Sequence, residues 1–296
     1  MDGKLQFIYM IVCRSCVKTV QSMEALLATG QHAFEHDGTI IAYYIRGRGP
    51  PCFVPPYPWG LNSEPIRSFL RPLETHVTMI YHDPPGTGRS GPPLTEKDLG
   101  MERVVSDLFA LQTRLGLDDA IFLGHSGGSA CALTYALRYP ERVSSLVLIG
   151  SGARLPDYGK VRGVGEALAD SLRERNESNF RRFLAAFLGP EIRTRRGKMA
   201  MGKAMKHSIQ FSIDRAAYNF VEMIRWDVRD KIRSLSIRTL IIAGKQDEAT
   251  PVTLSRELHK GIKGSRIVVF DRCGHFPFLD EPERFRKAVV EFLDMG

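Results

Sequence analysis

The sequence has no apolar run that approaches the about 20 residues a membrane-spanning helix needs. The nearest candidate, residues 5–12, is short, follows a single lysine and lacks a small-residue cleavage site, so a signal peptide is disfavoured too. Cysteine is scarce, since five in 296 residues do not make a disulfide framework. Cys13 and Cys16 form a C-x-x-C without a second pair, and we interpret them as two plain thiols. We therefore expect a cytoplasmic, reduced protein without a metal site and without membrane association.

The net positive charge of the chain comes from one segment. Lysine and arginine number 41 against 33 acidic residues, which gives a net charge of +8. Residues 151–235 hold 18 of these basic residues and 10 of the acidic ones, so they carry the whole excess. Its most basic region, residues 193–206, has no interleaved aromatic residues and no nucleic-acid-binding motif, which disfavours DNA or RNA as a partner. The hydrophobic fraction of 43% is that of an ordinary globular protein.

Short apolar runs alternate with helical patterns along most of the chain. Asp37-Gly38 between two β-rich runs is typical of a hairpin turn. Strands alternating with helices predict a mainly parallel sheet covered on both faces. Residues 151–235 break this rhythm with helical patterns and no convincing strand, so we expect a helical cap there. The chain then divides into an N-terminal extension (1–30), an α/β core (31–150 and 236–296) and the cap (151–235). Strands are predicted at 32–35, 39–44, 52–54, 77–81, 120–123, 146–149, 240–243 and 267–270, and helices at 101–115, 132–137 and 285–293.

The stretch GHSGGS at residues 124–129 follows an apolar strand and precedes a helix. It fits G-x-S-x-G, in which a sharp strand-to-helix turn exposes the serine at the edge of a sheet. Glycine has a low propensity for both helices and strands. Here the absence of its side chain avoids a collision with the tight turn. Ser126 is thus a candidate nucleophile, although the motif alone would also fit a glycine-rich turn around an inert serine.

A serine hydroxyl needs a base, and the base needs an orienting acid. Asp247 follows the apolar strand 240–243, and His275 follows the strand 267–270. A parallel sheet brings the ends of such strands to one edge, where open α/β sheets usually carry their sites. The chain order serine, aspartate, histidine is that of the hydrolase arrangement. Asp247 is the preferred acid. Three other carboxylates stay open as partners of His275: Glu248, Asp271 and Asp280.

Several longer motifs together resemble the α/β-hydrolase fold superfamily in its cap-bearing branch. They are YHDPPGTGRS (81–90), GHSGGS (124–129), YPERVSSLVLIG (139–150), TLIIAGKQDEATPV (239–252) and GHFPFLDEPERF (274–285). The similarity runs from about residue 30 to the end. It implies an α/β fold with a mostly parallel eight-stranded sheet flanked by helices and a helical cap inserted after strand six. It also implies that Ser126 is the nucleophile, His275 the base and Asp247 the orienting acid.

Acyl transfer also needs two donors for the developing oxyanion. One is expected from the N–H of Gly127, the residue after the nucleophile. The second comes from the loop after the third strand, where relatives usually have His-Gly but this chain has PPYPWG at 55–60. Because prolines have no N–H, Tyr57 is the best-placed donor, and it matches the family position. A stiff loop with its donor elsewhere stays open as the alternative.

These features predict a cofactor-free serine hydrolase that cleaves a small-molecule ester, lactone or thioester through an acyl-enzyme. The basic cap raises the hypothesis of an anionic substrate, against the simpler interpretation of a solvated helix face. A proline-iminopeptidase-like aminopeptidase is the main alternative, and a ligand receptor on a hydrolase scaffold is the second. Enzymes that open epoxides or remove halides are excluded by the serine at position 126. The chain is expected to be a monomer or a homodimer, with substrate contacts from Trp59, His125, Trp226 and Phe276.

Overall fold

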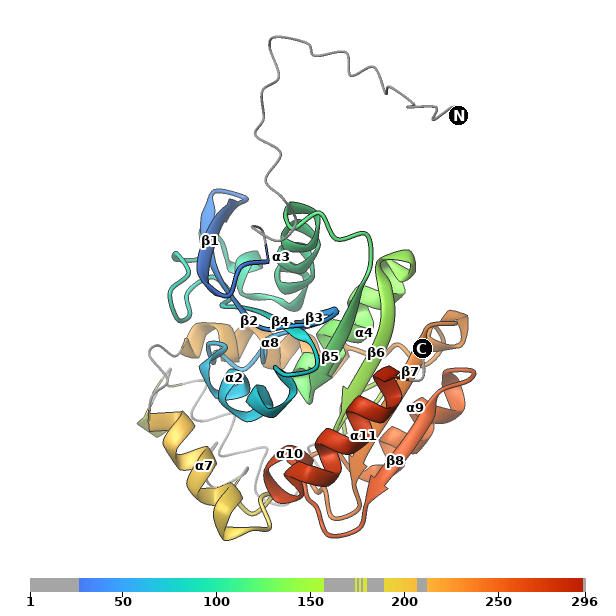
Figure 1. The fold of residues 1–296 in the computed structure, drawn as a ribbon. Helices are drawn as coiled ribbons and strands as arrows, with labels where there is room; N and C mark the ends of the chain where they lie inside the picture. The colour runs from blue at the N-terminus through green and yellow to red at the C-terminus, as the bar shows by residue number, and fades with distance from the viewer. Residues whose placement is uncertain are drawn as a thin grey trace, which may run out of the picture.

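The computed structural model describes residues 27–156, 174, 176, 178–179, 189–206 and 212–294. Within them, eight strands form one sheet in the order β1-β2-β4-β3-β5-β6-β7-β8 (Figure 1). β2 runs antiparallel to β1 and β4, and every other pair of neighbours is parallel. The strands are β1 (Gly30–His36), β2 (Thr39–Gly47), β3 (Pro51–Val54), β4 (Thr78–His82), β5 (Ala120–His125), β6 (Val143–Ile149), β7 (Arg238–Gly244) and β8 (Arg266–Phe270).

The predicted hairpin and the predicted parallel strands are confirmed. Asp37 and Gly38 both have a positive φ, 46° and 75°, as a two-residue hairpin turn requires. In the central strands, alternate side chains enter the two faces of the sheet. Phe53 of β3 and Phe122 of β5 stack on one face with ring centroids 5.2 Å apart, while Cys52 and Ile121 beside them belong to the core on the other face.

Helices cover both faces of the sheet. The face that carries Phe53 packs against α3, α4 and α9, and the opposite face packs against α2 and α11. The amphipathic pattern of α3 places Val104, Leu108 and Leu111 inward, and all three are fully buried. The helices are α2 (Glu64–Leu70), α3 (Met101–Arg114), α4 (Gly127–Arg138), α7 (Arg195–Lys206), α8 (Ile213–Arg225), α9 (Val252–Gly261), α10 (Pro277–Asp280) and α11 (Pro282–Asp294).

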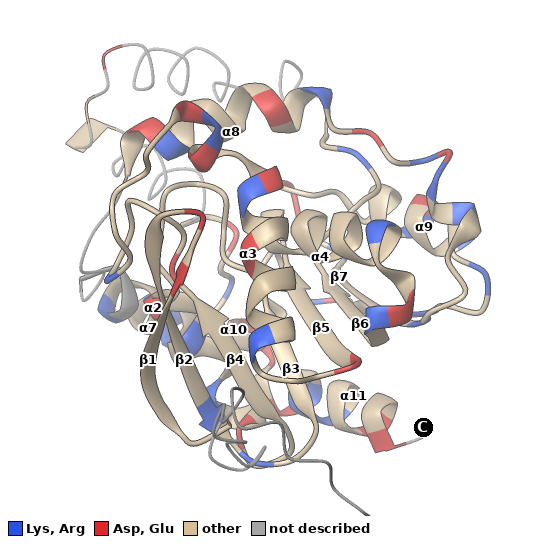
Figure 2. Cartoon of the chain, turned by 90° about the horizontal axis from the view of Figure 1, so that it is seen from above, with Lys and Arg blue, Asp and Glu red and all other residues tan. Residues whose placement is uncertain are grey.

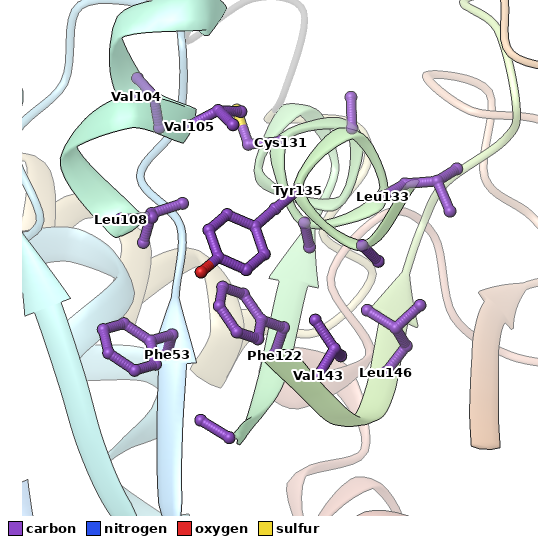
Figure 3. Close-up of a cluster of buried hydrophobic side chains, with 14 of the residues drawn as sticks. Phe53, Val104, Val105, Leu108, Phe122, Cys131, Leu133, Tyr135, Val143 and Leu146 are labelled. Carbon is purple, nitrogen blue, oxygen red and sulfur yellow. The ribbon is translucent and has the colours of Figure 1, made fainter. Parts of the chain in front are cut away.

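One dense part of the core lies between α3, α4 and β5. Figure 3 shows Tyr135 of α4 pointing toward Phe122 of β5, with Leu108 of α3 beside them. The rings of Tyr135 and Phe122 stack with centroids 4.4 Å apart, and the Tyr135 hydroxyl donates a hydrogen bond to Gln112 Oε1. This packing fixes α4 against the strand that precedes it. The turn between β5 and α4 therefore rests on a rigid base.

The predicted fold class is confirmed, including helices in the insertion that follows β6. Helices α7 and α8 lie in the chain between β6 and β7; in the colours of Figure 2, α8 carries both basic and acidic residues. Arg215 of α8 is buried and donates to the carbonyls of Pro85, Asp98 and Leu99, which ties α8 to the core. Strand pairing within the described part of this insertion is limited to one bridge between Arg154 and Asp227. The boundaries at 151 and 235 stay a prediction. Residues 1–26, with Cys13 and Cys16, lie outside the described residues.

None of the described helices is both long enough and apolar enough to cross a membrane.

Candidate active site

The serine of the glycine-rich motif sits on a strained turn. β5 ends at His125 and α4 begins at Gly127, so Ser126 is the single residue between them. Its φ of 53° and ψ of −124° lie in a region that non-glycine residues rarely adopt. The Ser126 N–H donates to the carbonyl of Ile149 at the end of β6, 2.9 Å away. That bond holds the turn at the carboxyl edge of the sheet, as the motif predicts.

The helix after the serine begins earlier than the sequence pattern indicates. The pattern predicts helix over residues 132–137, whereas α4 starts at Gly127 and includes two glycines of the motif. Close packing explains why glycine is needed there despite its poor helix propensity. A Cβ on Gly127 would lie 2.5 Å from Cδ of Pro58, and one on Gly128 would lie 2.7 Å from the carbonyl oxygen of Pro55. The proline-rich loop after β3 thus lies directly against the first turn of α4.

Two partners for the serine meet at the same edge. His275 Nδ1 donates to Asp247 Oδ2 at 2.8 Å, and both side chains are almost completely buried. The second Asp247 oxygen accepts the Thr250 N–H at 2.6 Å, which fixes the orientation of the carboxylate. Burial lowers the pKa of His275, but the charge and hydrogen bond of Asp247 outweigh it, so the net pKa is raised. The pair is therefore arranged to hold one ring tautomer and to stabilise an imidazolium.

The other carboxylates considered for His275 are engaged elsewhere. Asp271 is exposed and pairs with Lys245 at 3.2 Å. Asp280 accepts the backbone N–H groups of Arg193 and Thr194. The side chain of Glu248 is 82% exposed. Of the four candidates, Asp247 alone is bonded to the His275 ring.

The His275 ring lies beside the end of β6, close to the serine turn. A Cβ on Gly150 would lie 3.0 Å from His275 Nδ1 and 3.1 Å from Cε1. Gly150 follows Ile149, whose carbonyl accepts the Ser126 N–H. Among the described residues no hydrogen bond joins Ser126 Oγ to the ring. Such bonds are often long without substrate and shorten when it binds, so the geometry is compatible with a serine–histidine pair.

Ser126 lines a cavity between the core and the insertion. The described lining residues include Trp59 from the loop after β3, Met223 from α8 and Trp226 just after it. Ser151 and Arg154, from the chain after β6, also line it. Two of the four predicted substrate contacts, Trp59 and Trp226, thus share the cavity with Ser126. His125 and Phe276 are buried and are not among its described lining residues.

His125 instead connects three parts of the site. Its Nε2–H donates to the carbonyl of His275 at 2.7 Å, and its Nδ1 accepts from the Tyr57 hydroxyl at 2.8 Å. Burial, followed by the nearby His275, lowers the pKa of His125 well below its usual value, so the ring is neutral. Burial likewise raises the pKa of Tyr57, which keeps its hydroxyl protonated as a donor. His125 therefore links the loop that carries Tyr57 to the loop that carries His275.

The two predicted oxyanion donors lie on adjoining segments. Gly127 is the first residue of α4, so its N–H has no partner within the helix. The Tyr57 N–H has no backbone acceptor among the described residues. Pro58, the residue after Tyr57, is the one that approaches Gly127. The arrangement is compatible with two amides facing one oxygen, as the sequence predicts.

One residue near the site has no counterpart in the sequence predictions. Glu191, in the insertion, is buried, and its carbonyl oxygen accepts the His275 N–H at 3.2 Å. The sequence does carry one signal for it. The glycine before His275, Gly274, leaves room for this backbone contact, because a Cβ there would lie 2.2 Å from the Glu191 carbonyl oxygen.

Comparison with known proteins decides the family. The model of a family described as "alpha/beta hydrolase fold" matches residues 58–282, more than half of the chain. The chain belongs to the alpha/beta hydrolase fold family. Among curated proteins it is 30% identical over 280 residues to the 2-hydroxymuconate semialdehyde hydrolase of Pseudomonas putida, which covers 90% of this chain and 92% of the relative. It is 27% identical to the proline iminopeptidase of Saccharolobus solfataricus, over 74% of this chain and 76% of the relative.

A solved structure of similar architecture is that of an esterase from Exiguobacterium antarcticum. It has a TM-score of 0.77 and 25% identity, and the match covers 90% of this chain and all of the esterase. The prediction of a hydrolase is confirmed for this chain at the level of the enzyme class.

Proposed function

We propose that this alpha/beta hydrolase is a serine hydrolase that cleaves a small-molecule ester, lactone or thioester through an acyl-enzyme. The observation that carries the proposal is the buried His275–Asp247 hydrogen bond at the sheet edge where the strained Ser126 lines a cavity. A hydroxyl without such a pair is a weak nucleophile. The similarity to an esterase over nearly the whole chain supports the same chemistry.

In the proposed reaction, His275 Nε2 takes the proton of Ser126 Oγ while Oγ bonds to the substrate carbonyl carbon. The oxygen that becomes negative accepts hydrogen bonds from the N–H groups of Gly127 and Tyr57. The bond to the leaving oxygen or sulfur then breaks, and the proton on the ring moves to the leaving atom. Water repeats the sequence on the acyl-enzyme, which releases the acid and restores the serine.

A second candidate, proline-iminopeptidase activity, is favoured by the 27% identity to the Saccharolobus enzyme. The charge of the described cap counts against a cationic substrate amine. Three exposed basic residues, Arg195, Arg196 and Lys198, stand at the start of α7, which has no acidic residue in its first turn. A basic surface favours an anionic substrate by long-range attraction. Proposed substrates are therefore esters, lactones or thioesters that bear a carboxylate or phosphate.

Substrate profiling tests the choice between these activities. The purified chain is assayed against p-nitrophenyl esters, lactones, acyl thioesters and proline p-nitroanilide. We expect turnover of the acyl esters and no release from the proline amide. Faster cleavage of the proline amide would favour the peptidase. Tight ligand retention with no turnover on any substrate would favour the receptor alternative.

Labelling with a fluorophosphonate tests the nucleophile. Ser126 Oγ is expected to bond to phosphorus with loss of fluoride, so Ser126→Ala abolishes both labelling and acyl transfer. Ser151→Ala is the matched control, because Ser151 lines the same cavity and its buried hydroxyl has no hydrogen-bond partner in the part of the chain that the structure describes. Labelling that persists in Ser126→Ala and disappears in Ser151→Ala would refute the assignment.

A further inference from the structure

Glu191 makes contact with both loops that carry the proposed acid and base. Its carbonyl oxygen accepts the N–H of His275 at 3.2 Å. Its carboxylate oxygen Oε2 accepts the N–H of Glu248, the residue after Asp247, at 3.1 Å. The residue as a whole is only 3% exposed. A carboxylate is seldom buried without a partner, and the partner of this one is a backbone N–H in the loop that carries Asp247.

The chain around Glu191 is tied to the same two loops at further points. The N–H groups of Arg193 and Thr194 both donate to Asp280 Oδ1, at 2.8 and 2.9 Å. The Arg193 guanidinium donates to the carbonyl of Gln246 at 2.7 Å. Segment 191–194 therefore bridges the stretch before Asp247 and the short helix α10 that follows His275.

The charge of Glu191 also acts on the proposed base. Burial and the charge of Asp247 raise the pKa of Glu191, while the Glu248 N–H, His275 and Arg193 act in the opposite direction. In return, the negative charge of Glu191 adds to that of Asp247 in raising the pKa of His275. The ring of His125 also lies against the His275 ring, with centroids 4.6 Å apart, and it is neutral because burial lowers its pKa.

We propose that Glu191 is a positioning residue, which holds the His275 loop through its carbonyl and the Asp247 loop through its carboxylate. The proposal rests on the proposed function, in which the ring of His275 is the base. A group on the insertion thereby orients two residues of the core. Sub-ångström placement of a base matters because small displacements cost large factors in rate.

The test compares two glutamates that are close in space but differ in burial. Glu191→Gln removes the buried charge and keeps an oxygen that can accept the Glu248 N–H. Glu248→Gln removes a charge from a side chain that is 82% exposed. The titration of His275 is followed by NMR of the imidazole in the full chain. Glu191→Gln is expected to lower the pKa of His275 by about one unit, and Glu248→Gln to leave it nearly unchanged.

Activity gives the second measurement. The acid limb of kcat/KM is expected to move to lower pH in Glu191→Gln by the same amount as the NMR titration. Glu191→Ala, which also removes the acceptor, is expected to lower kcat about tenfold with little change in KM, and Glu191→Gln to restore most of it. Parent-like kcat in Glu191→Ala, or identical titrations in Glu191→Ala, Glu191→Gln and the parent, would overturn the proposal. If the parent hydrolyses no acyl substrate, the proposed function fails, while the NMR titration still decides the role of Glu191.

Discussion

Replacing Gly150 by alanine tests whether the position of His275 controls the reaction. Gly150 has a φ of 53°, a left-handed conformation that costs an alanine about 1–2 kcal/mol. The new Cβ would also lie 3.0 Å from Nδ1 and 3.1 Å from Cε1 of His275, and 3.4 Å from Oδ2 of Asp247. Carbon atoms prefer separations of about 3.5–4.0 Å, so the ring must move by roughly half an ångström.

Gly116 provides a matched control. Its φ is 67°, so Gly116→Ala carries a similar backbone cost, but no atom of the described residues lies within 4 Å of the added Cβ. Both variants are expected to lose about 1–2 kcal/mol of unfolding free energy and a few degrees of Tm. Displacement of a catalytic group by 1 Å can cost about 100-fold, so kcat in Gly150→Ala should fall about tenfold. In Gly116→Ala it should stay unchanged.

The assay is initial-rate hydrolysis of a p-nitrophenyl ester, with thermal unfolding measured on the same preparations. If Gly150→Ala keeps the parent kcat while losing the same stability as Gly116→Ala, then the ring beside Gly150 is not the working base. Equal loss of activity in both variants would instead trace the effect to stability.

Three further outcomes are expected. A general base must be neutral and the pKa of His275 is raised, so the midpoint of the acid limb of kcat/KM should lie above the usual histidine pKa of about 6.5. Asp247→Asn should move that midpoint to lower pH and should also lower kcat. Raising the salt concentration should lower kcat/KM for an anionic ester more than for a neutral one, and Lys198→Glu on α7 should reduce that difference. Equal salt responses for the two esters would refute electrostatic attraction of the substrate by α7. Phe122→Ala should cost about 3–5 kcal/mol in a denaturant titration, since its ring is fully buried between Phe53 and Tyr135, whereas Phe109→Ala, at a side chain that is partly exposed, should cost less.

Local patterns predict most of the sheet and the sequence-local parts of the site. The Asp37-Gly38 turn and the strained Ser126 both follow from short motifs, because each geometry is imposed by neighbours in the chain. The helix start at Gly127 is missed, because contact with the distant Pro58 overrides the low helix propensity of glycine. Helix α2 is missed for a different reason: it is only seven residues long and opens with Glu64-Pro65, so its apolar pattern is too short to indicate a helix.

Contacts between distant segments are what the sequence does not indicate. His125 lies within the nucleophile motif, directly before Ser126, which suggests a substrate contact. Its two ring nitrogens instead bond to residues 68 and 150 positions away. Glu191 contacts His275, which lies 84 positions later in the chain. A single glutamate among basic residues forms no sequence pattern from which this contact could be predicted. The glycine at position 274 is the one sequence feature related to this contact, because a side chain there would collide with the Glu191 carbonyl.

The bond between the Glu191 carbonyl and the His275 N–H limits how this enzyme can be re-engineered. Exchanging residues 151–235 for the equivalent region of another hydrolase removes the acceptor of the buried His275 N–H, so the replacement must supply another. An unsatisfied buried donor costs about 1–3 kcal/mol. A chimera that retains residues 189–194 from this chain avoids that loss, so the practical splice points for swapping specificity lie inside the insertion and not at its ends.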